Sequence, residues 1–169
     1  MWRWEQIAEW LKEPKLGAEL GVKEGRFTQY LLQKFPTLHM VAVDLWQEKP
    51  SSTRRGFETY KTWDFGKIQA DYRLRTAPFQ DRLTTMQCDT VKAAESFVDG
   101  TFDFVFIDAE HTYEAVKADI AAWLPKIRSG GLLSGHDYSG SFPGVCDAVN
   151  EMKRKIIEGT DKVWAIRVD

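Results

Sequence analysis

The stretch that most constrains this chain is residues 16–28, Leu-Gly-Ala-Glu-Leu-Gly-Val-Lys-Glu-Gly-Arg-Phe-Thr. A short apolar run that carries Glu19 ends at Gly21, Gly25 follows four residues later, and apolar residues at helical spacing begin at Phe27. This order predicts a strand, a tight glycine turn and the start of a helix, a geometry that brings backbone N–H groups close to a ligand.

A second apolar segment, 40–45, strengthens this interpretation because it carries Asp44 near its end, 25 positions after Glu19. In an open α/β sheet, an acid at the tip of the second strand is suited to bind the hydroxyls of a ribose. The glycines follow the pattern Glu-x-Gly-x-x-x-Gly, and a carboxylate beside them disfavours a pyrophosphate but tolerates a cationic amino-acid cofactor. The alternative is that the glycines serve only a turn and a helix start in another α/β domain.

The remainder of the chain alternates strand and helix patterns. Strands are predicted at 16–21, 40–45, 83–89, 102–108, 132–137 and 162–168, the last paired in a hairpin with 156–158. Helices are predicted at 1–14, 25–35, 53–70, 90–98, 113–127 and 145–156. The expected fold class is α/β: a doubly wound, Rossmann-like, mostly parallel sheet with helices on both faces and an antiparallel C-terminal strand.

Length and charge exclude several classes of protein. The 169 residues fit a single domain, 1–169, and no apolar run reaches membrane-spanning length or forms a signal peptide, so we expect no membrane partner and a cytoplasmic protein. A net charge of −2 makes nucleic-acid binding an unfavoured function. The isolated Cys88 and Cys146 indicate neither a zinc site nor a disulfide framework, and the sequence does not specify an oligomeric state.

Residues 46–82 lack a clean period and are rich in aromatic side chains. We interpret this segment as a substrate lid or insertion, because long segments between sheet strands are commonly functional. Its arginines, Arg54, Arg55, Arg73 and Arg75, are suited to clamp a phosphate or carboxylate of an anionic acceptor. The alternative is a solvated helix whose aromatic residues belong to the core.

Acidic residues mark the carboxyl ends of four predicted strands: Asp44, Asp89, Asp108 and Asp137. Two of the three histidines, His111 and His136, stand close in sequence to the last two acids. Carboxylates with an imidazole suit a divalent cation such as Mg²⁺ or Mn²⁺, and Asp108, His136 and Asp137 are the expected metal ligands. The alternative is that Asp108 and Thr112 cap the following helix and that His111 is a loop residue.

Four segments carry a family resemblance: 16–28, Phe-Ile-Asp-Ala-Glu-His-Thr-Tyr at 106–113, Trp-Leu-Pro-Lys-Ile-Arg-Ser-Gly-Gly at 123–131, and Gly-His-Asp-Tyr at 135–138. Together they resemble the class I S-adenosylmethionine-dependent methyltransferases, in a small bacterial and phage branch related to the metal-dependent O-methyltransferases of the catechol and caffeoyl-coenzyme A type. The resemblance runs from about Leu16 to Asp169 and is weakest over 46–82.

The resemblance implies S-adenosylmethionine as the cofactor and a position for each binding residue. Glu19, Gly21 and Gly25 are expected around the methionine part, Asp44 on the ribose, Cys88 and Asp89 beside the adenine, and Asp108 near the methionine end.

The resemblance also implies the catalytic residues. Asp108 corresponds to the first metal carboxylate, the pair His136-Asp137 to an Asp-Asn pair, and His111 to a lysine base, so the chain departs from the family pattern at both histidines. We expect His111 and Asp137 to be catalytic, because an imidazole of near-neutral pKa removes a hydroxyl proton more readily than a charged lysine does.

The expected function is methyl transfer from S-adenosylmethionine to a hydroxyl of a small molecule, such as a sugar, a nucleotide-linked sugar or an acidic metabolite. One alternative is a metal-dependent hydrolase that uses Asp108, His136 and Asp137, and another is a non-catalytic nucleotide-binding module. The sequence does not identify the acceptor.

Overall fold

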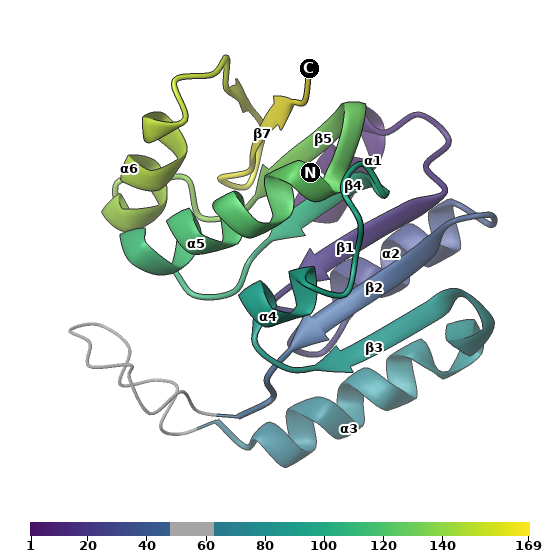
Figure 1. Ribbon diagram of the computed structural model, residues 1–169. Helices are drawn as coiled ribbons and strands as arrows, with labels where there is room; N and C mark the ends of the chain where they lie inside the picture. Colours follow the sequence, from purple (N-terminus) through teal and green to yellow (C-terminus); the bar gives the residue numbers. More distant parts are fainter. Residues whose placement is uncertain (48–62) are drawn as a thin grey trace.

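The computed structural model describes residues 1–47 and 63–169 (Figure 1). The strands are β1 (Leu16–Leu20), β2 (His39–Asp44), β3 (Leu83–Gln87), β4 (Phe102–Ile107), β5 (Ile127–Gly135), β6 (Ile157–Glu158) and β7 (Trp164–Arg167). The α-helices are α1 (Arg3–Trp10), α2 (Arg26–Lys34), α3 (Phe65–Thr76), α4 (Thr90–Ala94), α5 (Tyr113–Trp123) and α6 (Pro143–Glu151). Within the described ranges, none of the helices has the length and apolar character that a bilayer crossing requires.

The strands form one seven-stranded sheet in the order β3-β2-β1-β4-β5-β7-β6. The strands β3, β2, β1, β4 and β5 are parallel to one another, whereas β7 pairs antiparallel with β5 and β6 pairs antiparallel with β7. The predicted fold class and the C-terminal hairpin are therefore confirmed. The strand order reverses between β1 and β4, and ligands of open α/β sheets bind outside the strand ends at such a point.

Helices cover both faces of the sheet because the central strands are apolar on both sides (Figure 1). On one face Phe104 and Phe106 of β4 pack in a buried cluster with residues of α1 and α2, and the rings of Phe27 and Phe106 stack with centroids 4.1 Å apart. On the other face Val105 and Ile107 pack with residues of α4, α5 and α6. The helix α3 lies along the β3 edge.

The helix predicted at 53–70 is confirmed over 65–70 and extends further toward the C-terminus than predicted. The helix α3 begins at Phe65 and continues to Thr76, and residues 53–62 lie outside the described part of the chain. Asp64 fixes the start, because its carboxylate accepts the backbone N–H of Lys67 at 2.9 Å as an N-cap.

Other predicted boundaries are wrong by several residues, for local reasons. A 3₁₀ turn at Leu124–Lys126, with a proline at its start, ends the helical region, so that Ile127 begins β5 instead of closing α5. The helix α6 ends at Glu151, and Lys153 adopts a left-handed φ of +51° that a helix cannot continue through. The helix α4 ends at Ala94 instead of Val98.

Candidate active site

A cavity of about 380 Å³ opens where β1, β2, β3 and β4 end at the carboxyl edge of the sheet. Aromatic side chains from the start and the middle of segment 46–82, Trp46, Trp63 and Phe65, form part of its wall. Five of the predicted site residues also line it: Gly21, Asp44, Asp89, Asp108 and His111. The cavity therefore brings together acids from three strand ends, and the glycine turn of a fourth, that are far apart in sequence.

The turn after β1 depends on glycine. Gly21 has a φ of +84°, and a Cβ atom at this position would lie 2.3 Å from the backbone oxygen of Asp108. Gly25 caps α2 with a φ of +74°, and a Cβ there would lie 2.7 Å from the ring of Tyr72. Only a residue without a side chain lets the β1 turn approach the end of β4 this closely.

Glu19 lies behind this turn instead of in the cavity wall. Its side chain is buried, and its carboxylate accepts hydrogen bonds from the backbone N–H and the hydroxyl of Thr28, in the first turn of α2. Burial raises the pKa of Glu19 well above its ordinary value, with the hydrogen bonds from Thr28 opposing this shift. The structure thus places Glu19 where it ties β1 to the start of α2.

Asp44 connects the β1 turn to the end of β2. One carboxylate oxygen accepts the N–H groups of Val22 and Lys23 at 2.8 and 2.9 Å, and the other accepts that of Trp46 at 2.7 Å. These bonds fix the orientation of the carboxylate at the cavity wall, and Oδ1, which accepts only the N–H of Trp46 among them, can accept a further hydrogen bond.

Asp89 and Cys88 follow β3 but face different surroundings. Asp89 lines the cavity and caps α4, because its carboxylate accepts the N–H of Val91 at 3.0 Å. Cys88 packs against the apolar cluster between the sheet and α4–α6.

The predicted arginine clamp is not assembled by the described residues. Arg75 donates to the backbone oxygen of Glu24 and to the side chain of Gln29 at 3.0 Å each, so it is bound to α2. Arg73 is exposed on α3, and Arg54 and Arg55 lie outside the described residues.

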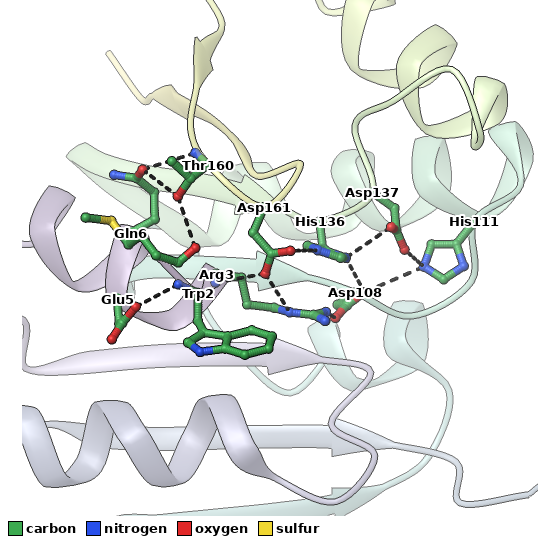
Figure 2. Close-up of polar contacts among 11 residues, drawn as sticks. Trp2, Arg3, Glu5, Gln6, Asp108, His111, His136, Asp137, Thr160 and Asp161 are labelled. Carbon is green, nitrogen blue, oxygen red and sulfur yellow. Dashed lines mark hydrogen bonds and ion pairs between the residues drawn. The ribbon is translucent and has the colours of Figure 1, made fainter.

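A cluster of acids and histidines lies beyond the ends of β4 and β5 (Figure 2). The Nε2 atom of His111 is 3.1 Å from Oδ2 of Asp137 and 3.6 Å from Oδ1 of Asp108. The Nδ1 atom of His136 is 3.2 Å from Oδ1 of Asp137 and 3.7 Å from Oδ1 of Asp108. Asp137 has a left-handed φ of +59°, a backbone strain that is common at functional sites.

The protonation of His111 follows from this arrangement. Burial disfavours the charged imidazole, but the hydrogen bonds and charges of Asp108 and Asp137 outweigh burial and raise the pKa of His111 to about 9. Burial alone would raise the pKa of Asp137. The hydrogen bonds and charges of His111 and His136 outweigh burial, so that the pKa of Asp137 falls well below its usual range. The near-neutral pKa expected for His111 is therefore wrong, because the carboxylates on both sides stabilise its charged form.

Two residues of the cluster were missed at the level of sequence. Nη1 of Arg3, in α1, donates to Oδ2 of Asp108 at 2.5 Å, and Oδ2 of Asp161, in the β6–β7 turn, accepts the backbone N–H of Arg3 at 3.0 Å. No spacing signal could have found them, because 105 residues separate Arg3 from Asp108.

Comparison with known proteins identifies the family. A family model described as "Methyltransferase domain" matches residues 18–138, which include the glycine turn, Asp44 and the acid–histidine cluster. The chain belongs to the class I S-adenosylmethionine-dependent methyltransferases. No curated protein matches the sequence significantly.

Solved structures share the fold of this methyltransferase at low sequence identity. Cofactor-bound Rv0187 from MTB is 16% identical, with a TM-score of 0.64 over 92% of this chain and 73% of that one. The O-methyltransferase from Bacillus cereus, in complex with SAH, is 16% identical, with a TM-score of 0.61 over 92% and 74%. MycE from the mycinamycin biosynthetic pathway, in complex with Mg and SAH, is 19% identical, with a TM-score of 0.57 over 90% and 44%.

The methyltransferase offers a set of donor atoms that fits a divalent cation. Asp108, His111 and Asp137 each place one ligand atom within 4.8 Å of the others. This grouping contains His111, whereas the sequence-based set contains His136 as the third ligand. Two carboxylates with one imidazole suit Mn²⁺ better than Mg²⁺, which prefers oxygen ligands.

Proposed function

We propose that this methyltransferase moves the methyl group of S-adenosylmethionine to a hydroxyl of a small molecule. The observation that carries the proposal is one cavity lined both by Asp44 and Asp89 and by Asp108 and His111. Asp44 and Asp89 stand at the ends of parallel strands, where an open α/β sheet binds a nucleoside. Asp108 and His111 carry a carboxylate and an imidazole, which are groups that can transfer a proton. A methyl donor and its acceptor must meet in line in such a shared space.

For the cofactor, we assign the ribose hydroxyls to Asp44 and the exocyclic amine of the adenine to Asp89. Gly21 and Asp108 border the methionine part, because both line the cavity where β1 and β4 end. Glu19, Gly25 and Cys88 contribute from behind this wall: the first two hold the turn and the start of α2, and Cys88 packs under the adenine side.

For catalysis, we assign the proton transfer to His111 and its orientation to Asp137. The 3.1 Å contact between Nε2 of His111 and Oδ2 of Asp137 fixes the ring beside the cavity. With a pKa of about 9, His111 carries a proton at neutral pH and becomes a base as the pH rises.

We further propose that Asp108, His111 and Asp137 hold a divalent cation, with His136 as the neighbouring donor. A bound Mn²⁺ or Mg²⁺ would lower the pKa of the acceptor hydroxyl. Nε2 of His111 cannot hold a cation and accept a proton at once, so His111 serves as the base only in the metal-free protein.

The competing functions leave parts of the cavity unused. A metal-dependent hydrolase would use Asp108, His136 and Asp137 but would give no role to Asp44 and Asp89. A nucleotide-binding module would leave the acid–histidine cluster without a role.

Calorimetry with S-adenosylhomocysteine, S-adenosylmethionine and NADH tests the cofactor assignment. Binding of the first two, without binding of NADH, supports it, and the reverse result would overturn it. The acceptor class is then tested by transfer of a labelled methyl group to pools of sugars, nucleotide-linked sugars and acidic metabolites. Label in an alkali-stable ether supports O-methylation, whereas label only on amines contradicts it.

A further inference from the structure

The acid–histidine cluster is part of a closed ring of charges that includes the N-terminal helix (Figure 2). Its members alternate between basic and acidic side chains in the order Arg3, Asp108, His111, Asp137, His136 and Asp161. The ring closes through Asp161, which lies 3.8 Å from Nε2 of His136 through Oδ1 and 3.8 Å from Nε of Arg3 through Oδ2. Arg3 is the only arginine or lysine among these members, and it contacts the carboxylates of both Asp108 and Asp161.

The position of Arg3 is fixed by contacts of α1 with the β6–β7 turn. Asp161 accepts the backbone N–H of Arg3, and Gln6 accepts the backbone N–H and the hydroxyl of Thr160 at 3.1 and 3.2 Å. On the other side of α1, Ile7 is fully buried in the apolar cluster beneath the sheet. The guanidinium therefore reaches Asp108 from an element that is docked by both polar and apolar contacts.

The guanidinium competes with a cation for the same carboxylate. One oxygen of Asp108 accepts the hydrogen bond from Nη1 of Arg3, and the other faces His111 and His136. A divalent ion among Asp108, His111 and Asp137 would lie within a few ångströms of this permanent positive charge, because Asp108, one of its ligands, accepts the hydrogen bond from Nη1 of Arg3 at 2.5 Å. Like charges at this distance, in a partly buried site, repel strongly.

We propose that Arg3 is a positioning residue whose guanidinium binds Asp108 beside the cation site, so that docking of α1 and binding of a divalent ion oppose each other. The proposal rests on the metal site proposed above and is independent of the acceptor. Arg3 holds Asp108 in place in the metal-free protein, and a bound ion weakens this contact and loosens the N-terminal helix.

The test is Mn²⁺ calorimetry on the full chain and on Arg3→Gln. We expect Arg3→Gln to bind Mn²⁺ at least about tenfold more tightly, equivalent to about 1.4 kcal/mol. Arg3→Lys, which keeps the charge, should stay close to the wild type. Arg26→Gln, at an exposed position in the first turn of α2, removes the same net charge and should change the affinity less than about twofold.

Hydrogen exchange of the wild type provides a second readout. Peptides that cover residues 1–11 should exchange faster with saturating Mn²⁺ than without it, while peptides from α2 should not change. Binding of S-adenosylhomocysteine by each variant shows that the fold and the cofactor site are intact, so failure of this proposal is separable from failure of the proposed function.

Three results would overturn the proposal. The first is Mn²⁺ binding by Arg3→Gln that is equal to or weaker than that of the wild type, which would make Arg3 a support of the metal site. The second is α1 exchange that is slowed or unchanged by Mn²⁺. The third is the absence of Mn²⁺ binding by both proteins at millimolar concentration.

Discussion

Asp44 has a structural role in addition to the ribose-binding role that we propose for it. Its hydrogen bonds to Val22, Lys23 and Trp46 hold the end of β2 against the glycine turn, and its place in the cavity wall leaves it accessible to a ligand. A residue in this position is therefore already oriented before the cofactor arrives, which reduces the entropy cost of binding.

Asp44→Ala should weaken the binding of S-adenosylhomocysteine by about 1–3 kcal/mol, because the ribose hydroxyls lose their acceptor. Calorimetry measures the change. Asp99→Ala is the matched control, since the Asp99 side chain is 71% exposed and contacts Lys126 away from the cavity. Asp44→Asn removes the charge but nearly keeps the shape of the side chain. Unchanged affinity in both Asp44 variants would move the ribose site elsewhere.

The raised pKa of Glu19 predicts that the stability of the protein depends on pH. Burial raises its folded-state pKa well above that of the unfolded chain, which is about 4.3. A carboxyl group with a raised folded pKa contributes most at low pH, and its contribution is lost as the pH rises from the unfolded value through the folded value. Glu19→Gln, which mimics the protonated form, should therefore be more stable relative to the wild type at pH 8 than at pH 5.

Thermal unfolding at the two pH values measures this difference. Glu95→Gln is the control, because Glu95 is exposed on the surface after α4 and should leave the pH dependence of the melting temperature unchanged. A stability difference for Glu19→Gln that is constant between pH 5 and pH 8 would show that Glu19 is ionised throughout this range.

At the scale of elements, α3 is packed against the start of α2 and does not stand apart as a separate insertion. Tyr72 of α3 is buried, its ring lies 4.7 Å from that of Trp46, and its hydroxyl is 2.5 Å from that of Thr85 in β3. The close approach of Tyr72 to Gly25 joins α3 to the N-terminus of α2. The part of segment 46–82 that forms α3 thus belongs to the core, and a lid function is a proposal only for the part of the segment that precedes α3.

Gly25→Ala should destabilise the protein more than a glycine-to-alanine substitution at another position with a similar positive φ. The left-handed φ alone costs about 1–2 kcal/mol for a residue with a Cβ, and the contact with Tyr72 should add about 1–3 kcal/mol of overpacking. Gly100→Ala is the matched control, because Gly100 has a similar φ of +71° but open space around its added Cβ.

Urea unfolding of the two glycine variants isolates the packing contribution. A larger loss for Gly25→Ala supports the role of α3 in the core. Equal losses for the two variants would show that Tyr72 moves away at little cost and that α3 is only loosely attached to α2.

The element boundaries show where sequence patterns are sufficient. The apolar period identifies α2, α5 and the buried β4 because a helix face or a central strand needs many apolar residues in register. The start of α3 depends instead on a single capping hydrogen bond of Asp64, and the start of β5 on a 3₁₀ turn with a proline. Such features are fixed by one or two contacts and leave no period to detect.

At the scale of the whole molecule, parallel strands explain why half of the site could be predicted. The acids Asp44, Asp89 and Asp108 all follow parallel strands, whose carboxyl ends share one edge of the sheet. Arg3 and Asp161 reach the site from α1 and from the β6–β7 turn, which no strand order places there. Their positions depend on the docking of α1, a tertiary contact that leaves no local pattern in the sequence.

The cavity joins two functions that a single histidine variant should separate. His111 contacts the carboxylates of Asp108 and Asp137, whereas the acids assigned to the nucleoside, Asp44 and Asp89, stand at the end of β2 and just after β3. His111→Ala should leave the affinity for S-adenosylhomocysteine within about threefold of the wild type and should weaken Mn²⁺ binding at least about tenfold, both by calorimetry. With an acceptor identified by the methyl-transfer screen, turnover of the metal-free protein should fall about 10²–10⁴-fold, the usual contribution of a positioned proton-transfer group.

His39→Ala is the matched control for this experiment. His39 is exposed at the first residue of β2, at the opposite edge of the sheet from the cavity, so all three quantities should stay at their wild-type values. Loss of S-adenosylhomocysteine binding with retained Mn²⁺ binding in His111→Ala would contradict the division of the cavity, because it would place the cofactor on the histidine and leave the cation to other ligands. A retained Mn²⁺ affinity with reduced turnover would instead assign His111 to proton transfer alone, and the metal would then depend on His136 beside Asp137.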